Sequence, residues 1–117
     1  MKNLTASEIT KLAIAELNNR GGVYWRNNNI PVRGRINNVK KGVSDILGIS
    51  RAGVFVACEV KTVNDRLSSE QIDFLTTVKA LGGAALLATE ENGLFKLKEY
   101  TNEKERNTTN QSASGKR

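Results

Sequence analysis

The chain has 117 residues, 38% of them hydrophobic and 26% charged, a composition typical of one globular domain rather than of a disordered chain. Eighteen Lys and Arg against 12 Asp and Glu give a net charge of +6, which favours a polyanionic partner such as nucleic acid, an anionic membrane or a phosphorylated ligand. The absence of histidine and the single cysteine, Cys58, exclude Ser-His-Asp triads, histidine-ligated metals, intramolecular disulfides and cysteine-rich zinc sites.

No apolar run approaches the roughly 18 residues that span a bilayer. The polar start Met1-Lys2-Asn3 is not followed by the apolar segment of a signal peptide. A lone thiol fits a reducing compartment. We therefore expect a soluble, cytoplasmic protein with no membrane partner.

Residues 5–20 are expected to form the first helix, with Ile9, Leu12, Ala13 and Leu17 at helical spacing. Thr5 and Glu8 match a capping box at its start. Residues 23–26 are β-prone and predict a short strand. Residues 27–42 then form a long polar loop, and loops of this length are often functional.

Residues 45–49 and 54–61 predict a hairpin of two strands. Alternation in the second strand places Glu59 and Lys61 on one face, opposite the face of Cys58 and the valines. Cys58 is expected to be a small buried apolar residue.

Ser68 and Gln71 form a second capping box, which predicts a helix that ends at Gly82-Gly83. Its expected buried stripe consists of Ile72, Leu75, Val78 and Leu81. Residues 84–88 predict a buried strand, and residues 94–98 are a further edge-strand candidate. From residue 101 the composition turns polar, so we expect one domain over residues 1–100 and a disordered tail over 101–117.

The resulting order is helix, strand, strand, strand, helix, strand. This order predicts an α/β fold with a mixed central sheet of about four strands flanked by helices.

Asp45, Glu59 and Lys61 are the sharpest candidates for chemistry. Pairing of the two hairpin strands would bring Asp45 beside Glu59, with Lys61 on the same face. Two carboxylates with main-chain carbonyls and water suit Mg²⁺, and a lysine can stabilise charge on a phosphate. The alternative is that Glu59 and Lys61 form an ion pair on a solvated sheet while Asp45 caps a turn.

The sequence resembles the virus-type replication-repair nuclease (VRR-NUC) family of the PD-(D/E)XK nuclease superfamily. The similarity covers roughly residues 6–90 and lies in four motifs with consistent spacing: Gly42-Val43-Ser44-Asp45-Ile46-Leu47-Gly48, Glu59-Val60-Lys61, Leu67 to Phe74, and Gly82-Gly83. The resemblance implies a restriction-endonuclease-like core. Ser44 stands where the superfamily has its proline, a backbone feature without chemistry.

By this resemblance, Asp45, Glu59 and the carbonyl of Val60 hold the metal, expected to be Mg²⁺ with Mn²⁺ as a substitute, and Lys61 is the catalytic lysine. Gln71 matches a family position near the active site, although its capping box with Ser68 also explains it. Glu8 is the preferred first-helix acid, as a catalytic residue and metal ligand, and Glu16 is its rival.

The segment from Arg20 to Arg51 contains seven basic residues and one acid, which suits a surface that follows phosphates. A solvated basic loop is the alternative. The residues expected to bind DNA are Arg26, Asn27, Arg33, Arg35, Lys40 and Lys41. Trp25 is expected in the core or in an interface.

The resemblance implies a metal-dependent, structure-selective DNA endonuclease that acts on branched DNA such as four-way (Holliday) junctions in phage-type replication, recombination or repair. A phage-encoded enzyme would work in the bacterial host cytoplasm. Standalone viral members of the family are homodimers, and one active site per chain favours a two-fold dimer for cutting two strands. A catalytically silent DNA-binding module and a restriction- or toxin-like nuclease remain alternatives.

Overall fold

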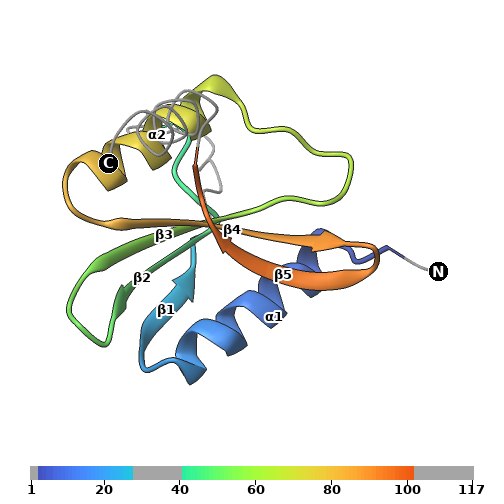
Figure 1. The fold of residues 1–117 in the computed structure, drawn as a ribbon, viewed down its shortest axis with the longest axis horizontal. Helices are drawn as coiled ribbons and strands as arrows, with labels where there is room; N and C mark the ends of the chain where they lie inside the picture. The colour runs from blue at the N-terminus through green and yellow to red at the C-terminus, as the bar shows by residue number, and fades with distance from the viewer. Residues whose placement is uncertain (1–2, 28–40, 102–117) are drawn as a thin grey trace, which may run out of the picture.

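The structure, a computed structural model, describes residues 3–27 and 41–101. Two helices and five strands follow one another along the chain (Figure 1). Their bounds are α1 Ala6–Asn19, β1 Gly22–Arg26, β2 Ile46–Ser50, β3 Phe55–Val60, α2 Ser69–Ala80, β4 Ala84–Glu91 and β5 Leu94–Glu99. Every expected element is present, and the edge-strand candidate is a true fifth strand.

Both helices begin with the expected capping boxes. Thr5 Oγ1 accepts from the N–H of Glu8 at 3.1 Å, and Glu8 Oε1 accepts from the N–H of Thr5 at 2.8 Å. Ser68 and Gln71 exchange the same pair of bonds at the start of α2. Each box satisfies two backbone donors that the helix itself leaves unpaired, which fixes where the helix begins.

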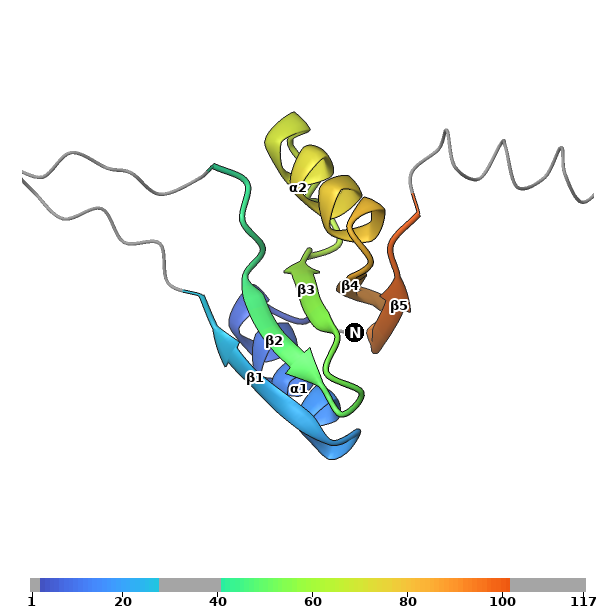
Figure 2. The same ribbon diagram turned by 90° about the vertical axis from the view of Figure 1, so that its left-hand side faces the viewer.

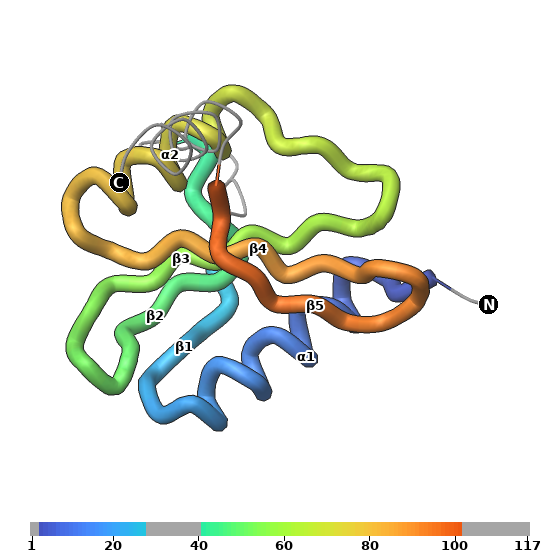
Figure 3. Tube along the Cα trace, viewed as in Figure 1, coloured from blue at the N-terminus to red at the C-terminus, as the bar shows by residue number. Residues whose placement is uncertain are grey.

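The five strands form one mixed sheet in the order β1-β2-β3-β4-β5. β3 and β4 are parallel, and every other neighbouring pair is antiparallel. α2 is the crossover between the two parallel strands and covers one face of the sheet, while α1 covers the other (Figures 1 and 2). Figure 3 shows the β4–β5 hairpin extending toward the start of α1. This α/β sandwich confirms the expected fold class.

Each helix buries a separate apolar cluster against the sheet. The cluster between α1 and the sheet consists of Ile9, Ala13, Leu17, Ile46, Cys58, Val60 and Ala88. The cluster between α2 and the sheet consists of Ala57, Leu75, Val78, Ala85 and Tyr100. The alternation predicted for β3 is therefore confirmed, because Cys58 faces α1 and Ala57 faces α2.

Several apolar residues expected in the core lie at the surface. Leu12 in α1 is 43% exposed, and in α2 Ile72 is 37% and Leu81 83% exposed. Each helix rests on the sheet through a narrow stripe of buried residues, spaced four apart in α1 and three apart in α2. Apolar residues beside this stripe therefore face solvent. Trp25 is 45% exposed, which excludes the core alternative for this residue.

Among the described residues, no helix is long and apolar enough to span a membrane.

Candidate active site

The hairpin β2–β3 brings Asp45 and Glu59 together at one end of the sheet. Ile46 lies opposite Cys58, so Asp45, one residue earlier, lies opposite Glu59, one residue later. Asp45 Oδ2 accepts from the N–H of Val60 at 2.9 Å. The predicted juxtaposition of the two carboxylates is therefore present.

Asn27 fixes the backbone that carries Asp45. Its N–H donates to the carbonyl of Asp45 at 2.7 Å, and its Nδ2 donates to the carbonyl of Ser44 at 3.3 Å. The pairing of β1 with β2 thus continues by one hydrogen bond beyond Arg26, and two bonds from Asn27 hold the Ser44–Asp45 backbone in place. The sequence indicated Asn27 only as a DNA contact, because this pairing between segments 17 residues apart has no local signal.

Gly42 packs the segment before Asp45 against the first turn of α2. Its φ is +83°, and a Cβ at this position would lie 2.3 Å from the carbonyl oxygen of Glu70. Only glycine combines this conformation with this contact. Gly42 therefore holds the segment that leads to Asp45 against the helix that provides Gln71.

Glu59 is a buried acid with an unsatisfied oxygen. Its side chain is 2% exposed, and its Oε1 has no hydrogen-bond partner. Burial, followed by the negative charge of Asp45, raises the pKa of Glu59 to about 8. The buried hydroxyl of Ser44 lies close to Glu59 and opposes this shift of the pKa, but Ser44 Oγ and Glu59 Oε1 do not meet hydrogen-bond geometry and both lack a partner. A cation beside the two acids would reverse the shift and use the unpaired oxygen.

Gln71 connects α2 to Glu59 at the end of β3 and to Lys61, which directly follows that strand. Its Nε2 donates to Glu59 Oε2 at 2.8 Å, and its Oε1 accepts from Lys61 Nζ at 2.9 Å. The same Oε1 accepts from the N–H of Ser68 in the capping box. The capping interpretation of Gln71 is therefore confirmed, and the same side chain also contacts both Glu59 and Lys61.

Lys61 lies just beyond β3 with its ammonium group held at two points. Besides Gln71, its Nζ donates to the carbonyl of Arg66 at 3.1 Å. Both partners are neutral oxygens, so the positive charge of Lys61 is not cancelled by a direct ion pair with Glu59. This arrangement contradicts the alternative of a simple Glu59–Lys61 ion pair on a solvated sheet.

The donor set fits a hard divalent cation. Asp45 and Glu59 supply carboxylate oxygens, and Val60 adds a main-chain carbonyl between Glu59 and Lys61 in sequence. Mg²⁺ binds through one or two carboxylates and keeps several waters, so it needs no third acid. Burial raises the pKa of the neighbouring Cys58 to about 12, which keeps this thiol protonated and outside the donor set.

Glu8 and Glu16 do not join this pair. In the part of the chain that the structure describes, no group of three or more Asp, Glu or Cys side chains could hold a metal. Glu8 is exposed and caps α1, and Glu16 bonds to Arg20 Nε at 3.0 Å. A role of Glu8 as metal ligand stays a prediction that this arrangement does not support.

The expected DNA contacts are described only in part. Arg26 and Lys41 are exposed at the two ends of the long loop. Arg33, Arg35 and Lys40 lie outside the described residues.

The model of the VRR-NUC domain family matches residues 25–91, more than half of the chain. The chain belongs to the VRR-NUC family. Its matched region contains Asp45, Glu59, Lys61 and Gln71 and thus the whole cluster described above. No curated protein matches the chain.

The fold also matches solved structures. One is Hjc from Archaeoglobus fulgidus, described as a Holliday junction resolvase from an archaeal hyperthermophile. The two share 18% sequence identity with a TM-score of 0.55, over 80% of this chain and 75% of Hjc. At this identity the match confirms the restriction-endonuclease-like fold, and the family match identifies a nuclease domain.

Proposed function

We propose that the protein is a Mg²⁺-dependent DNA endonuclease whose active site consists of Asp45, Glu59, the carbonyl of Val60, Lys61 and Gln71. The observation that supports this most strongly is the unpaired, buried oxygen of Glu59 beside a second carboxylate. Leaving such a group unpaired costs folding free energy, so a bound cation is the simplest reason for its presence. When bound, Mg²⁺ would polarise the phosphate and lower the pKa of a coordinated water.

The protein's own residues then have separate tasks. Asp45 and Glu59 hold the cation, and the bond from Val60 N–H fixes the orientation of Asp45. Lys61 stabilises negative charge that develops on the phosphate, since its ammonium group is held by neutral oxygens and remains available. Gln71 aligns Glu59 with Lys61 through its two bonds.

We propose branched DNA, in particular four-way junctions, as the substrate, in replication, recombination or repair of a phage-type genome. The family match and the fold shared with a Holliday junction resolvase support this choice. The net charge of +6 favours the dense phosphates of a junction.

The test is cleavage of labelled four-way junction, flap and linear duplex of matched sequence, with Mg²⁺, Mn²⁺ or chelator. We expect metal-dependent cuts in the junction at protein concentrations that leave the duplex intact. DNA binding without any cleavage would instead indicate a silent binding module. Equal cleavage of duplex and junction would indicate a restriction- or toxin-like nuclease.

We further propose a homodimer that pairs through the exposed apolar part of the α2-side face of the sheet. Val23, Ile49 and Phe55 form one row across β1, β2 and β3, and each is more than 40% exposed. Trp25, on the same face, is 45% exposed. α2 does not cover this part, and contiguous exposed apolar surface marks an interface. A second copy would supply the second active site that paired cuts need.

Ile49→Lys is expected to convert the dimer to a monomer, because a desolvated ammonium group in an apolar interface is unfavourable. Sedimentation equilibrium at several concentrations measures the molecular mass. Leu12→Lys, at an apolar position of similar exposure on α1, is the control and should leave the dimer intact. A wild-type mass of one chain at every concentration, or a dimer unchanged by Ile49→Lys, would contradict this interface.

A further inference from the structure

Two lysines of β5 lie on the same face of the sheet as the candidate active site. Glu59 is opposite Leu87 in β4, and Leu87 is opposite Lys98 in β5. Lys96, two residues before Lys98, shares its face because side chains alternate along a strand. Two strand spacings of about 4.8 Å put Lys98 on the order of 10 Å from Glu59.

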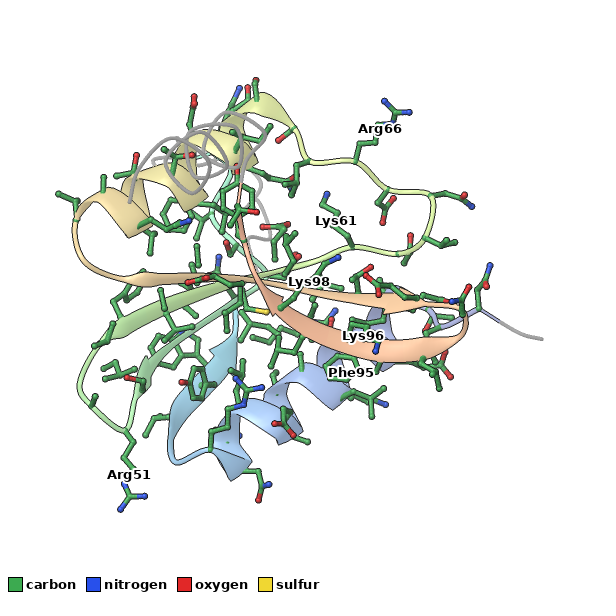
Figure 4. All side chains as sticks on the ribbon, in the orientation of Figure 1. Arg51, Lys61, Arg66, Phe95, Lys96 and Lys98 are labelled. Carbon is green, nitrogen blue, oxygen red and sulfur yellow. The ribbon has the colours of Figure 1, made fainter. Side chains whose placement is uncertain are left out.

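The packing of β5 confirms which face the two lysines occupy. Tyr100, two residues after Lys98, is buried with Leu75 and Val78 of α2. Phe95, directly before Lys96, and Leu97, between the two lysines, pack on the cluster between α1 and the sheet. Lys96 and Lys98 are therefore on the α2 side of the sheet, the side on which Figure 4 shows Lys61.

Both lysines are exposed and their existing contact is weak. Lys98 Nζ lies 2.8 Å from Glu91 Oε2, with side chains 52% and 49% exposed. Lys98 and then Lys96 lower the pKa of Glu91. An ion pair this exposed contributes little to stability, so Lys98 can exchange Glu91 for a phosphate at small cost.

We propose that Lys96 and Lys98 bind the DNA backbone about 10 Å from the cleaved bond, on the side of the site opposite β1 and β2. The proposal rests on the nuclease function proposed above and extends it. β1 and β2, with the exposed Arg26 at the end of β1, lie on one side of β3, and β5 with these lysines lies on the other. DNA bound across the central strand would then have cationic contacts on both sides of the cut. Lysines on an edge strand also discourage unwanted strand pairing, a role that needs no DNA.

The test measures the dissociation constant for a four-way junction against salt concentration, in chelator so that no cleavage occurs. Lys96→Ala with Lys98→Ala should raise the dissociation constant about tenfold and lower the salt slope by roughly 1 per lysine. Glu91→Gln should lower the dissociation constant about twofold, because it frees Lys98 from its competing acid. The matched control, Lys11→Glu, changes the net charge by the same two units at an exposed position on α1, which covers the other face of the sheet.

A second measurement locates the contact on the DNA. A methylphosphonate, which removes the charge of one phosphate, should weaken wild-type binding when placed within about two nucleotides of the cut. It should have no further effect on the variant that lacks both lysines, because the partner charge is already gone. Additive losses, or a double variant that binds like the control, would overturn the role of β5 and leave the nuclease proposal standing. A wild-type protein that binds no DNA would overturn both.

Discussion

Lys61→Ala is expected to lower the single-turnover rate of junction cleavage by about 10²–10³-fold, with little change in DNA affinity. Lys61 Nζ is held by Gln71 Oε1 and the carbonyl of Arg66, and neither partner neutralises its charge. Its loss removes stabilisation of charge in the transition state, whereas many other basic residues keep the DNA bound. Glu59→Ala is expected to abolish cleavage as well, because it removes a metal ligand.

The control for this prediction is Lys11→Ala, an exposed lysine on α1 that lies outside the site. It should cleave like the wild type. Thermal melting of each variant excludes unfolding as the reason for lost activity. Near-wild-type cleavage by folded Lys61→Ala or Glu59→Ala would show that the active site lies elsewhere.

Glu59→Gln is expected to remove cleavage and yet raise the free energy of unfolding of the metal-free protein. The fold raises the pKa of Glu59 from 4.5 to about 8, so the protonated acid is the form that the fold favours. The contribution of protonated Glu59 to the free energy of unfolding is complete below pH 4.5 and is lost as the pH rises toward 8. The neutral amide avoids this loss and still offers an oxygen to Gln71 Nε2.

The gain from Glu59→Gln should therefore be small at pH 4.5 and of order 2–4 kcal/mol at pH 8. Denaturant unfolding of both proteins in chelator at several pH values measures it. Mg²⁺ should stabilise the wild type and not the variant, since a ligand stabilises only the form that binds it. A variant less stable than the wild type at pH 8 would show that the ionised carboxylate is satisfied without a cation.

The parts of the fold that the sequence predicts well have local causes. The capping boxes at Thr5 and Ser68 determine where both helices begin, and alternation along 54–61 assigns each side chain of β3 to a face. The buried face of each helix is harder to predict. Leu12 and Ile72 are apolar, yet both are exposed because they lie beside the narrow contact between helix and sheet. Apolar character is a property of the residue, whereas burial depends on the neighbouring element.

The same division applies to the site. The grouping of Asp45 with Glu59 was predictable, because a hairpin pairs strands that are neighbours in sequence. Asn27 and Lys98 lie near the site because of pairings that involve β1 and β5. Their proximity could not be predicted, because no local sequence pattern specifies which strands pair or in which register. Glu8 caps α1 in the structure, and its predicted role as a metal ligand, which came from a motif spacing, stays a prediction.

Anomalous diffraction from crystals grown with Mn²⁺ is the most direct test of the metal site, because it locates the metal without reference to activity. We expect one strong peak in contact with a carboxylate oxygen of Asp45, with Glu59 Oε1 and with the carbonyl of Val60. The same peak should be absent in Glu59→Gln. A peak at Glu8 or Glu16, or no peak between Asp45 and Glu59 at saturating Mn²⁺, would contradict it.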